Sequence, residues 1–165
     1  MSVDVWWDVS GSTFEDAEAL TEFIIGSLNK ITPQGTRGFT LWLGPVGTDP
    51  DDMPLRMDLD PDPGASPVES IEAIADLTRI TRENVEGAAA VRWLPAELMA
   101  VDAEFTGRDI EVMEYSGDEL VHVPANLARV SIPTAIRIAV AYCQSGERFE
   151  GVEWEPAVAT DGATN

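Results

Sequence analysis

The chain has 165 residues, of which 44% are hydrophobic, and it carries 30 Asp and Glu against 10 Lys and Arg, for a net charge of −20 at pH 7. This length and apolar content suit one folded domain rather than an acidic disordered chain, and no apolar run reaches the roughly 18 residues that would span a membrane. Because so negative a chain repels nucleic-acid phosphates and anionic lipids, its charge disfavours both as direct partners and favours a basic protein.

The N-terminal segment predicts a strand followed by a helix. Apolar and polar residues alternate over residues 3–9, which is the period of a half-buried strand. Ser12 and Glu15 have the spacing of a capping box, and apolar residues three and four apart then predict an amphipathic helix over residues 13–29. Because the first residues lack the positive and apolar segments of a secretory signal, we expect a cytoplasmic protein.

The middle of the chain predicts a β-hairpin, a second helix and several further strands. Residues 39–43 form a strand with Thr40 and Trp42 facing outward, and residues 55–59 pair with it across a long loop. Apolar spacing predicts a helix over residues 67–80. Further strands are expected over residues 91–93, 98–105, 110–115 and 120–123, with turns at Gly107 and at residues 116–118.

The C-terminal segment predicts a second amphipathic helix and a closing strand. Ser131 is the expected N-cap, Pro133 suits the first turn, and Gly146 lies where a helix stop belongs. Residues 152–154 then predict a short strand, with Trp154 buried against the helix.

Together these patterns predict a single α+β domain over residues 1–155, with a mainly antiparallel sheet flanked by an N-terminal and a C-terminal amphipathic helix. The polar, small-residue segment 156–165 is expected to be a flexible tail.

An acidic segment in the middle of the chain resembles a calcium loop in its spacing. Asp58, Asp60, Asp62 and Glu69 fall at the first, third, fifth and twelfth positions of such a loop. However, Pro63 stands at the sixth position, where the loop needs glycine, and the preceding segment predicts a strand instead of a helix. We therefore expect an anionic surface here, with an ordinary solvated loop as the alternative.

No reaction centre stands out in the sequence. His122 is the only histidine and alternates with two valines in a predicted strand, and the sequence assigns it no orienting carboxylate. Cys143, the only cysteine, lies on the apolar stripe of the last helix, so we expect it in the core. Phosphate-loop, paired-cysteine and nucleophile-elbow motifs are absent. These observations favour a binding protein without a metal or cofactor over an enzyme.

A series of short motifs in the C-terminal third resembles one immunity-protein family of bacterial polymorphic toxin systems, the α+β family often paired with nucleic-acid deaminase toxins. The similarity covers residues 110–155, with weaker support from residues 3–9 and 39–46. The motifs are the turn Tyr115-x-Gly117-Asp118, the strand exit Val123-Pro124, the helix start Ile132-Pro133, the stop Gly146-Glu147-Arg148 and the ending Val152-Glu153-Trp154.

The resemblance implies that the protein protects the producing cell by binding a cognate toxin, often by covering the toxin's active site. The negative charge fits this role, because a toxin that modifies nucleic acid has a basic substrate channel. We expect carboxylates to steer the encounter and Tyr115 to supply an anchor. The expected contact residues are Asp58, Asp60, Asp62, Glu111, Tyr115, Asp118 and Glu119.

Two other classes of function stay open. One is a small carboxylate-dependent enzyme, because thirty acidic residues always offer some pair of carboxylates. The other is an acidic nucleic-acid mimic that regulates a host protein.

Overall fold

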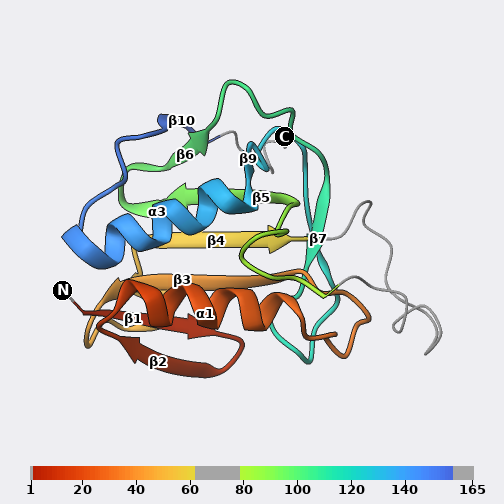
Figure 1. The fold of residues 1–165 in the computed structure, drawn as a ribbon, viewed down its shortest axis with the longest axis horizontal. Helices are drawn as coiled ribbons and strands as arrows, with labels where there is room; N and C mark the ends of the chain where they lie inside the picture. The colour runs from red at the N-terminus through yellow and green to blue at the C-terminus, as the bar shows by residue number, and fades with distance from the viewer. Residues whose placement is uncertain (1, 62–78, 158–165) are drawn as a thin grey trace.

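The computed structural model describes residues 2–61 and 79–157. Its central element is an antiparallel sheet (Figure 1). Within the described residues the strand order is β10-β6-β5-β4-β3-β1-β2, and β9 pairs with β5 beside this path. The main strands are β1 (Val3–Trp7), β2 (Ser10–Phe14), β3 (Phe39–Pro45), β4 (Leu55–Asp60), β5 (Ala88–Trp93), β6 (Leu98–Val101), β9 (Val130–Ser131) and β10 (Glu153–Pro156).

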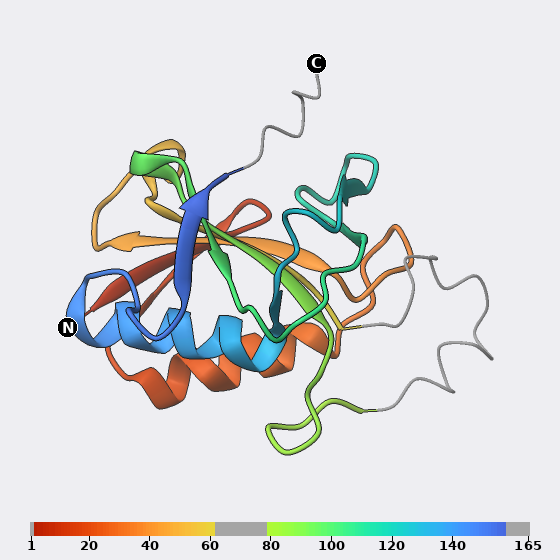
Figure 2. The same cartoon turned by 90° about the horizontal axis from the view of Figure 1, so that it is seen from above.

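Both described α-helices, α1 (Ala17–Leu28) and α3 (Ile132–Ser145), lie side by side on one face of this sheet (Figures 1 and 2). A core of fully buried side chains fills the space between the helices and the sheet. Its members include Leu20, Ile24 and Leu28 of α1, Ile132, Ile138 and Ala139 of α3, and Val5, Leu41, Leu43, Met57, Leu59 and Val91 of the sheet. The predicted α+β class with a mainly antiparallel sheet is confirmed, and the two helices share one face.

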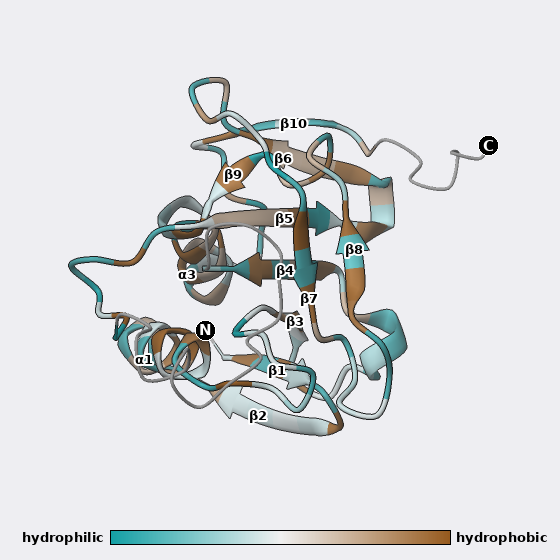
Figure 3. Ribbon diagram, turned by 90° about the vertical axis from the view of Figure 1, so that its right-hand side faces the viewer, coloured by the Kyte–Doolittle hydropathy of each residue, from teal (hydrophilic) through white to brown (hydrophobic). Residues whose placement is uncertain are grey.

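A smaller hairpin crosses the opposite face of the sheet (Figure 3). It consists of β7 (Ile110–Val112) and β8 (Val121–Val123), which pair antiparallel, and it encloses a second core with β5 and β6. Close approach is possible because Ala88 and Ala90 are small and because Gly38 has no side chain. A Cβ at Gly38 would collide with the carbonyl oxygen of Glu111.

The hairpin is also attached to β3 through its backbone. Met113 donates its amide to Gly38 and accepts from the amide of Thr40, both at 3.0 Å. The second sheet therefore covers the first in a fixed register. Two short 3-10 helices, η1 (Pro50–Asp52) and η2 (Leu94–Ala96), complete the described elements.

The predicted start of the first helix is wrong. Residues 10–14 form β2, which pairs with β1 across a turn where Asp8 has a φ of +51°. The helix begins at Ala17, and the carboxylate of Asp16 caps it by accepting from the amide of Glu18 at 3.0 Å. The capping-box spacing of Ser12 and Glu15 was therefore not used, because pairing with β1 fixes this segment as a strand.

The predicted end of the strand over residues 98–105 is also wrong. Strand β6 ends at Val101, because the Asp102 carboxylate accepts from the amide of Glu104 and turns the chain. The helix predicted over residues 67–80 falls almost wholly outside the described residues, as does most of the tail predicted over residues 156–165.

The β3–β4 hairpin and the last helix follow the sequence prediction. Leu41 and Met57 are paired between β3 and β4. Ser131 caps α3 by accepting from the amide of Thr134 at 3.2 Å, and Gly146 ends it with a φ of +75°. Trp154 on β10 packs against the helix-side core but stays half-buried, and its indole N–H donates to the carbonyl of Phe149 at 2.8 Å.

Candidate functional site

Aromatic and charged side chains gather on the face of the sheet opposite the helices. Successive residues of a strand point to opposite faces, and the leucines of β3 and β4 point toward the helices. The residues between them therefore point the other way. Cross-strand pairing places these residues in one row, in the order Trp6, Trp42, Arg56 and Arg92.

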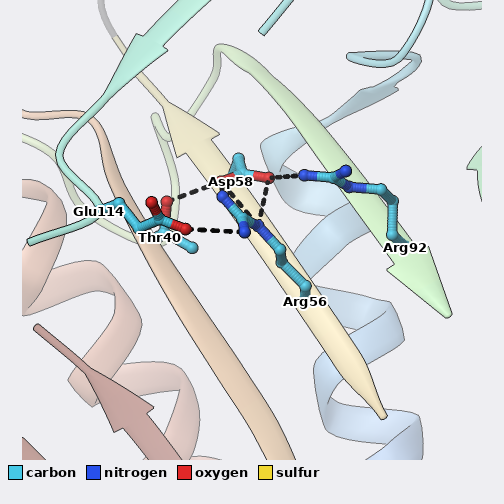
Figure 4. A network of polar contacts seen from close by, with 5 residues as sticks. All are labelled: Thr40, Arg56, Asp58, Arg92 and Glu114. Atoms are coloured by element: carbon cyan, nitrogen blue, oxygen red, sulfur yellow. Dashed lines mark hydrogen bonds and ion pairs between the residues drawn. The ribbon is translucent and has the colours of Figure 1, made fainter. Parts of the chain in front are cut away.

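Asp58 is the centre of a charge network on this face (Figure 4). Its side chain has no exposure to solvent and accepts from the Thr40 hydroxyl at 2.6 Å. Arg56 donates to its two oxygens at 3.1 and 3.2 Å, and Arg92 donates at 3.3 Å. Arg56 also pairs with the Glu114 carboxylate at 2.8 Å. The network thus connects β3, β4 and β5 to Glu114, which follows the β7 strand.

This network keeps Asp58 ionised. Burial alone would raise the pKa of Asp58, but the charges of Arg56 and Arg92 and the hydrogen bonds from Arg56 and Thr40 oppose it. The net effect is a pKa of Asp58 below its ordinary value. A carboxylate held in this way is a structural anion and a poor proton donor.

Asp60 holds the start of the β7–β8 hairpin. Its carboxylate accepts from the amide of Glu111 at 3.2 Å and lies 3.8 Å from the guanidinium of Arg108. Arg108 also donates to the backbone carbonyl of Asp60 at 3.0 Å. Asp60 therefore positions β7 on the sheet.

The expectation that Asp58 and Asp60 form an anionic surface is wrong. Their relative exposures are 0% and 1%, because the hairpin lies over the strand positions that would otherwise face solvent. Asp62, the third aspartate of that predicted surface, and Glu69, the twelfth position of the calcium-loop spacing that Pro63 interrupts, lie outside the described residues.

The remaining predicted contact residues lie together on the β7–β8 hairpin. Glu111 stands on β7 opposite His122, on the side of the strand that faces away from the core residues Ile110 and Val112. The other three, Tyr115, Asp118 and Glu119, belong to the loop of residues 113–120 that joins β7 to β8, and all three are exposed.

Hydrogen bonds from Gln34 and to Asp8 hold this loop in place. The side-chain amide of Gln34 donates to the carbonyls of Tyr115, Ser116 and Asp118 at 3.3, 3.1 and 2.6 Å. The amide of Ser116 donates to the Asp8 carboxylate, in the β1–β2 turn, at 3.0 Å. Elements that are distant in the sequence thus fix the course of the loop.

An aromatic stack supports Tyr115. Its ring stacks on Trp42 at 5.9 Å between centroids with 25° between the planes, and the Arg56 guanidinium lies 5.2 Å from the Trp42 ring. Trp42 is only 7% exposed, whereas the sequence predicted an outward side chain, because Tyr115 and Arg56 cover it. Tyr115 itself remains 37% exposed. The stack thus holds an exposed tyrosine against a buried tryptophan.

Sequence reasoning missed the residues that support the loop, namely Gln34, Trp42, Arg56 and Arg92. Alternation along β4 already places Arg56 on the same face as Asp58, so a charge pair two residues apart was the available signal. Gln34 carried no local signal, because its partners lie more than 80 residues away in the chain.

The other reactive groups show ordinary roles. His122 is exposed, with its Nε2 3.6 Å from the carboxylate of Asp109. Cys143 is buried, and burial raises the pKa of its thiol. Within residues 2–61 and 79–157, no three His, Cys, Asp or Glu side chains gather in a way that could hold a metal ion.

No protein-family model matches the chain, and no curated protein is significantly similar to it in sequence. In the described part of the chain, neither helix has the length and apolar character needed to cross a membrane.

Proposed function

We propose that this chain is an immunity protein, which binds and neutralises a cognate toxin domain by covering its active site or substrate channel. The toxin class that the sequence resemblance suggests is a nucleic-acid-directed deaminase, which has a basic substrate channel. The contact surface is the outer side of the β7–β8 hairpin with its connecting loop. The observation that carries the proposal is Tyr115, an exposed aromatic ring between acidic residues on a loop fixed by Gln34 and Asp8.

The distribution of charge supports a basic partner. Several of the ten basic residues are used inside the fold, since Arg56, Arg92 and Arg108 all bind buried aspartates. The acidic residues of the loop, Asp118 and Glu119, are exposed instead. These three arginines and the acids they pair with, Asp58, Asp60 and Glu114, cancel in charge, so the net charge of −20 lies on the rest of the chain. This negative charge accelerates the encounter with a positively charged partner.

The packing under Tyr115 supports its role as an anchor. Tyrosine is enriched among the residues that contribute most to binding, because it buries a large apolar area and keeps a polar hydroxyl. A ring already stacked on Trp42 loses little conformational freedom when a partner covers it. The loop backbone is likewise held before binding, so the cost of ordering it is small.

The alternative of a carboxylate-dependent enzyme has less support from the charge network around Asp58. An acid catalyst at neutral pH needs a carboxyl group whose pKa is raised and which substrate can reach. Asp58 has a lowered pKa, no solvent exposure, and every oxygen engaged by Thr40, Arg56 or Arg92. Its place in the network suits a structural anion that holds the binding loop.

The test purifies the product of the gene next to the one for this chain, which the proposal expects to contain the toxin domain, and follows modification of nucleic acid by that product. Saturating protein should abolish the modification. Tyr115→Ala should weaken inhibition about 30-fold, which corresponds to a loss of about 2 kcal/mol at a central contact. Leu94→Ala is the matched control, because Leu94 is equally exposed at 38% but lies on η2, outside the hairpin.

The control should leave inhibition within about threefold of the wild type, as expected for a residue outside the contact surface. Full toxin activity in the presence of saturating wild-type protein would show that the proposal is wrong. Equal losses in the Tyr115 and Leu94 variants would remove the hairpin as the contact surface.

A further inference from the structure

The two edges of the main sheet are protected differently. At one edge, β10 carries Glu153 and Glu155 and ends at Pro156, which has no amide to donate. Charged side chains and proline are the usual devices that prevent a sheet edge from pairing with another chain. At the other edge, β2 has the sequence Ser-Gly-Ser-Thr-Phe, with neither a charge nor a proline.

The open side of β2 is available for pairing. Its described backbone bonds within the sheet run to β1, and Figures 1 and 3 both show β2 along the outer border of the sheet. Residues 10–13 are all exposed. The strand is also firmly placed, because the Trp6 ring lies over Gly11 and the Thr13 hydroxyl donates to Asp4 at 2.6 Å.

The charge around β2 defines the kind of strand that would pair there. Four acidic residues occur before and after it, at Asp4, Asp8, Glu15 and Asp16. They outnumber the one basic residue among the first thirty, Lys30, whose ammonium lies 5.5 Å from the Trp7 ring of β1. A basic segment would therefore be attracted to this edge. A second copy of the chain would bring the same acids and a charge of −20 against it, which opposes self-pairing.

We propose that β2 binds an extended, basic segment of the partner as an added strand of the sheet. Such addition derives its affinity from main-chain hydrogen bonds along the edge. The edge adjoins the hairpin loop, because Asp8, two residues before β2, accepts from the amide of Ser116. The inference rests on the proposed function for the identity of the partner, which could then engage the loop and the edge together.

The test uses the full chain and a synthetic ten-residue peptide of alternating Lys and Val. A second peptide has the same sequence and charge but is N-methylated at alternate amides, so that it cannot donate along one edge. Backbone amide spectra and hydrogen exchange are recorded by NMR. The unmodified peptide should slow exchange in residues 10–14, and the methylated peptide should bind about tenfold more weakly, the effect of losing two or three hydrogen bonds.

Three results would overturn the inference. Equal affinity for both peptides would show attraction by charge alone, and protection at β10 in place of β2 would assign the wrong edge. If the β2 amides are protected from exchange without peptide, and this protection increases with protein concentration, a second copy of the chain would be the occupant. Because the peptide assay needs no toxin, these results are independent of whether the protein inhibits one.

Discussion

Replacing Asp58 by Asn should destabilise the protein by about 3 kcal/mol. The variant keeps the shape of the side chain but removes the buried anion that Arg56 and Arg92 share. Removing one member of a buried ion pair costs about 3 to 5 kcal/mol. The lower end applies because the two arginine side chains retain 16% and 24% exposure and because Arg56 keeps its bond to Glu114.

Urea unfolding measures this effect directly. With a denaturant slope of about 2 kcal/mol per molar, the midpoint should fall by about 1.5 M. Glu104→Gln removes the same charge from an exposed side chain and should change the free energy of unfolding by less than about 0.5 kcal/mol. If Asp58→Asn behaves like Glu104→Gln, the network does not stabilise the fold and the reasoning fails.

The stability difference between the wild type and Asp58→Asn should depend on pH. Because the pKa of Asp58 is lower in the folded protein than its ordinary value of 3.8, its contribution is fully present above that value. The contribution is lost as the pH falls through the lower, folded-state pKa. The stability difference between wild type and Asp58→Asn should therefore be constant near neutrality and shrink below about pH 4.

Three further predictions concern the rest of the fold. Gly38→Ala should cost about 2 kcal/mol in chemical unfolding, because its Cβ meets the Glu111 carbonyl, whereas Gly26→Ala, with open space in α1, should be stabilising by up to about 1 kcal/mol. Trp154→Ala should cost about 2 to 3 kcal/mol, less than a fully buried tryptophan, and Trp154→Phe about 1 kcal/mol for the lost bond to Phe149; equal losses in both would contradict this division. Thermal unfolding should not change when EDTA is added, and a lower midpoint would reveal a structural metal ion.

Local chemistry predicted the elements whose ends are set by neighbouring residues. Ser131 caps α3 and Gly146 ends it, because a hydroxyl at an N-cap and a glycine of positive φ act within one turn of helix. Period-two alternation likewise placed Met57 and its neighbours on the strand that pairs with β3. In both cases the physical cause lies within a few residues of the pattern.

The errors arose where contacts with other strands, near or far along the chain, decided the outcome. The spacing of Ser12 and Glu15 is compatible with both a helix start and a strand. Pairing with β1 selects the strand. Asp58 and Asp60 belong to an acidic segment that suggests solvent exposure, but the hairpin that buries them begins fifty residues later. The loop that carries Tyr115 was predicted as a contact region from its residue types, whereas its support by Gln34 required the structure.

The most direct test of toxin binding through the hairpin is the association rate between this chain and the toxin domain, measured by stopped flow over a range of salt concentrations. Asp118→Asn/Glu119→Gln should slow association several-fold at low salt and leave dissociation nearly unchanged, because steering acts before contact. Glu147→Gln/Glu150→Gln removes the same charge beyond the end of α3 and should have a smaller effect. Equal slowing by both pairs would contradict a hairpin site, and the absence of a complex would contradict the immunity function itself.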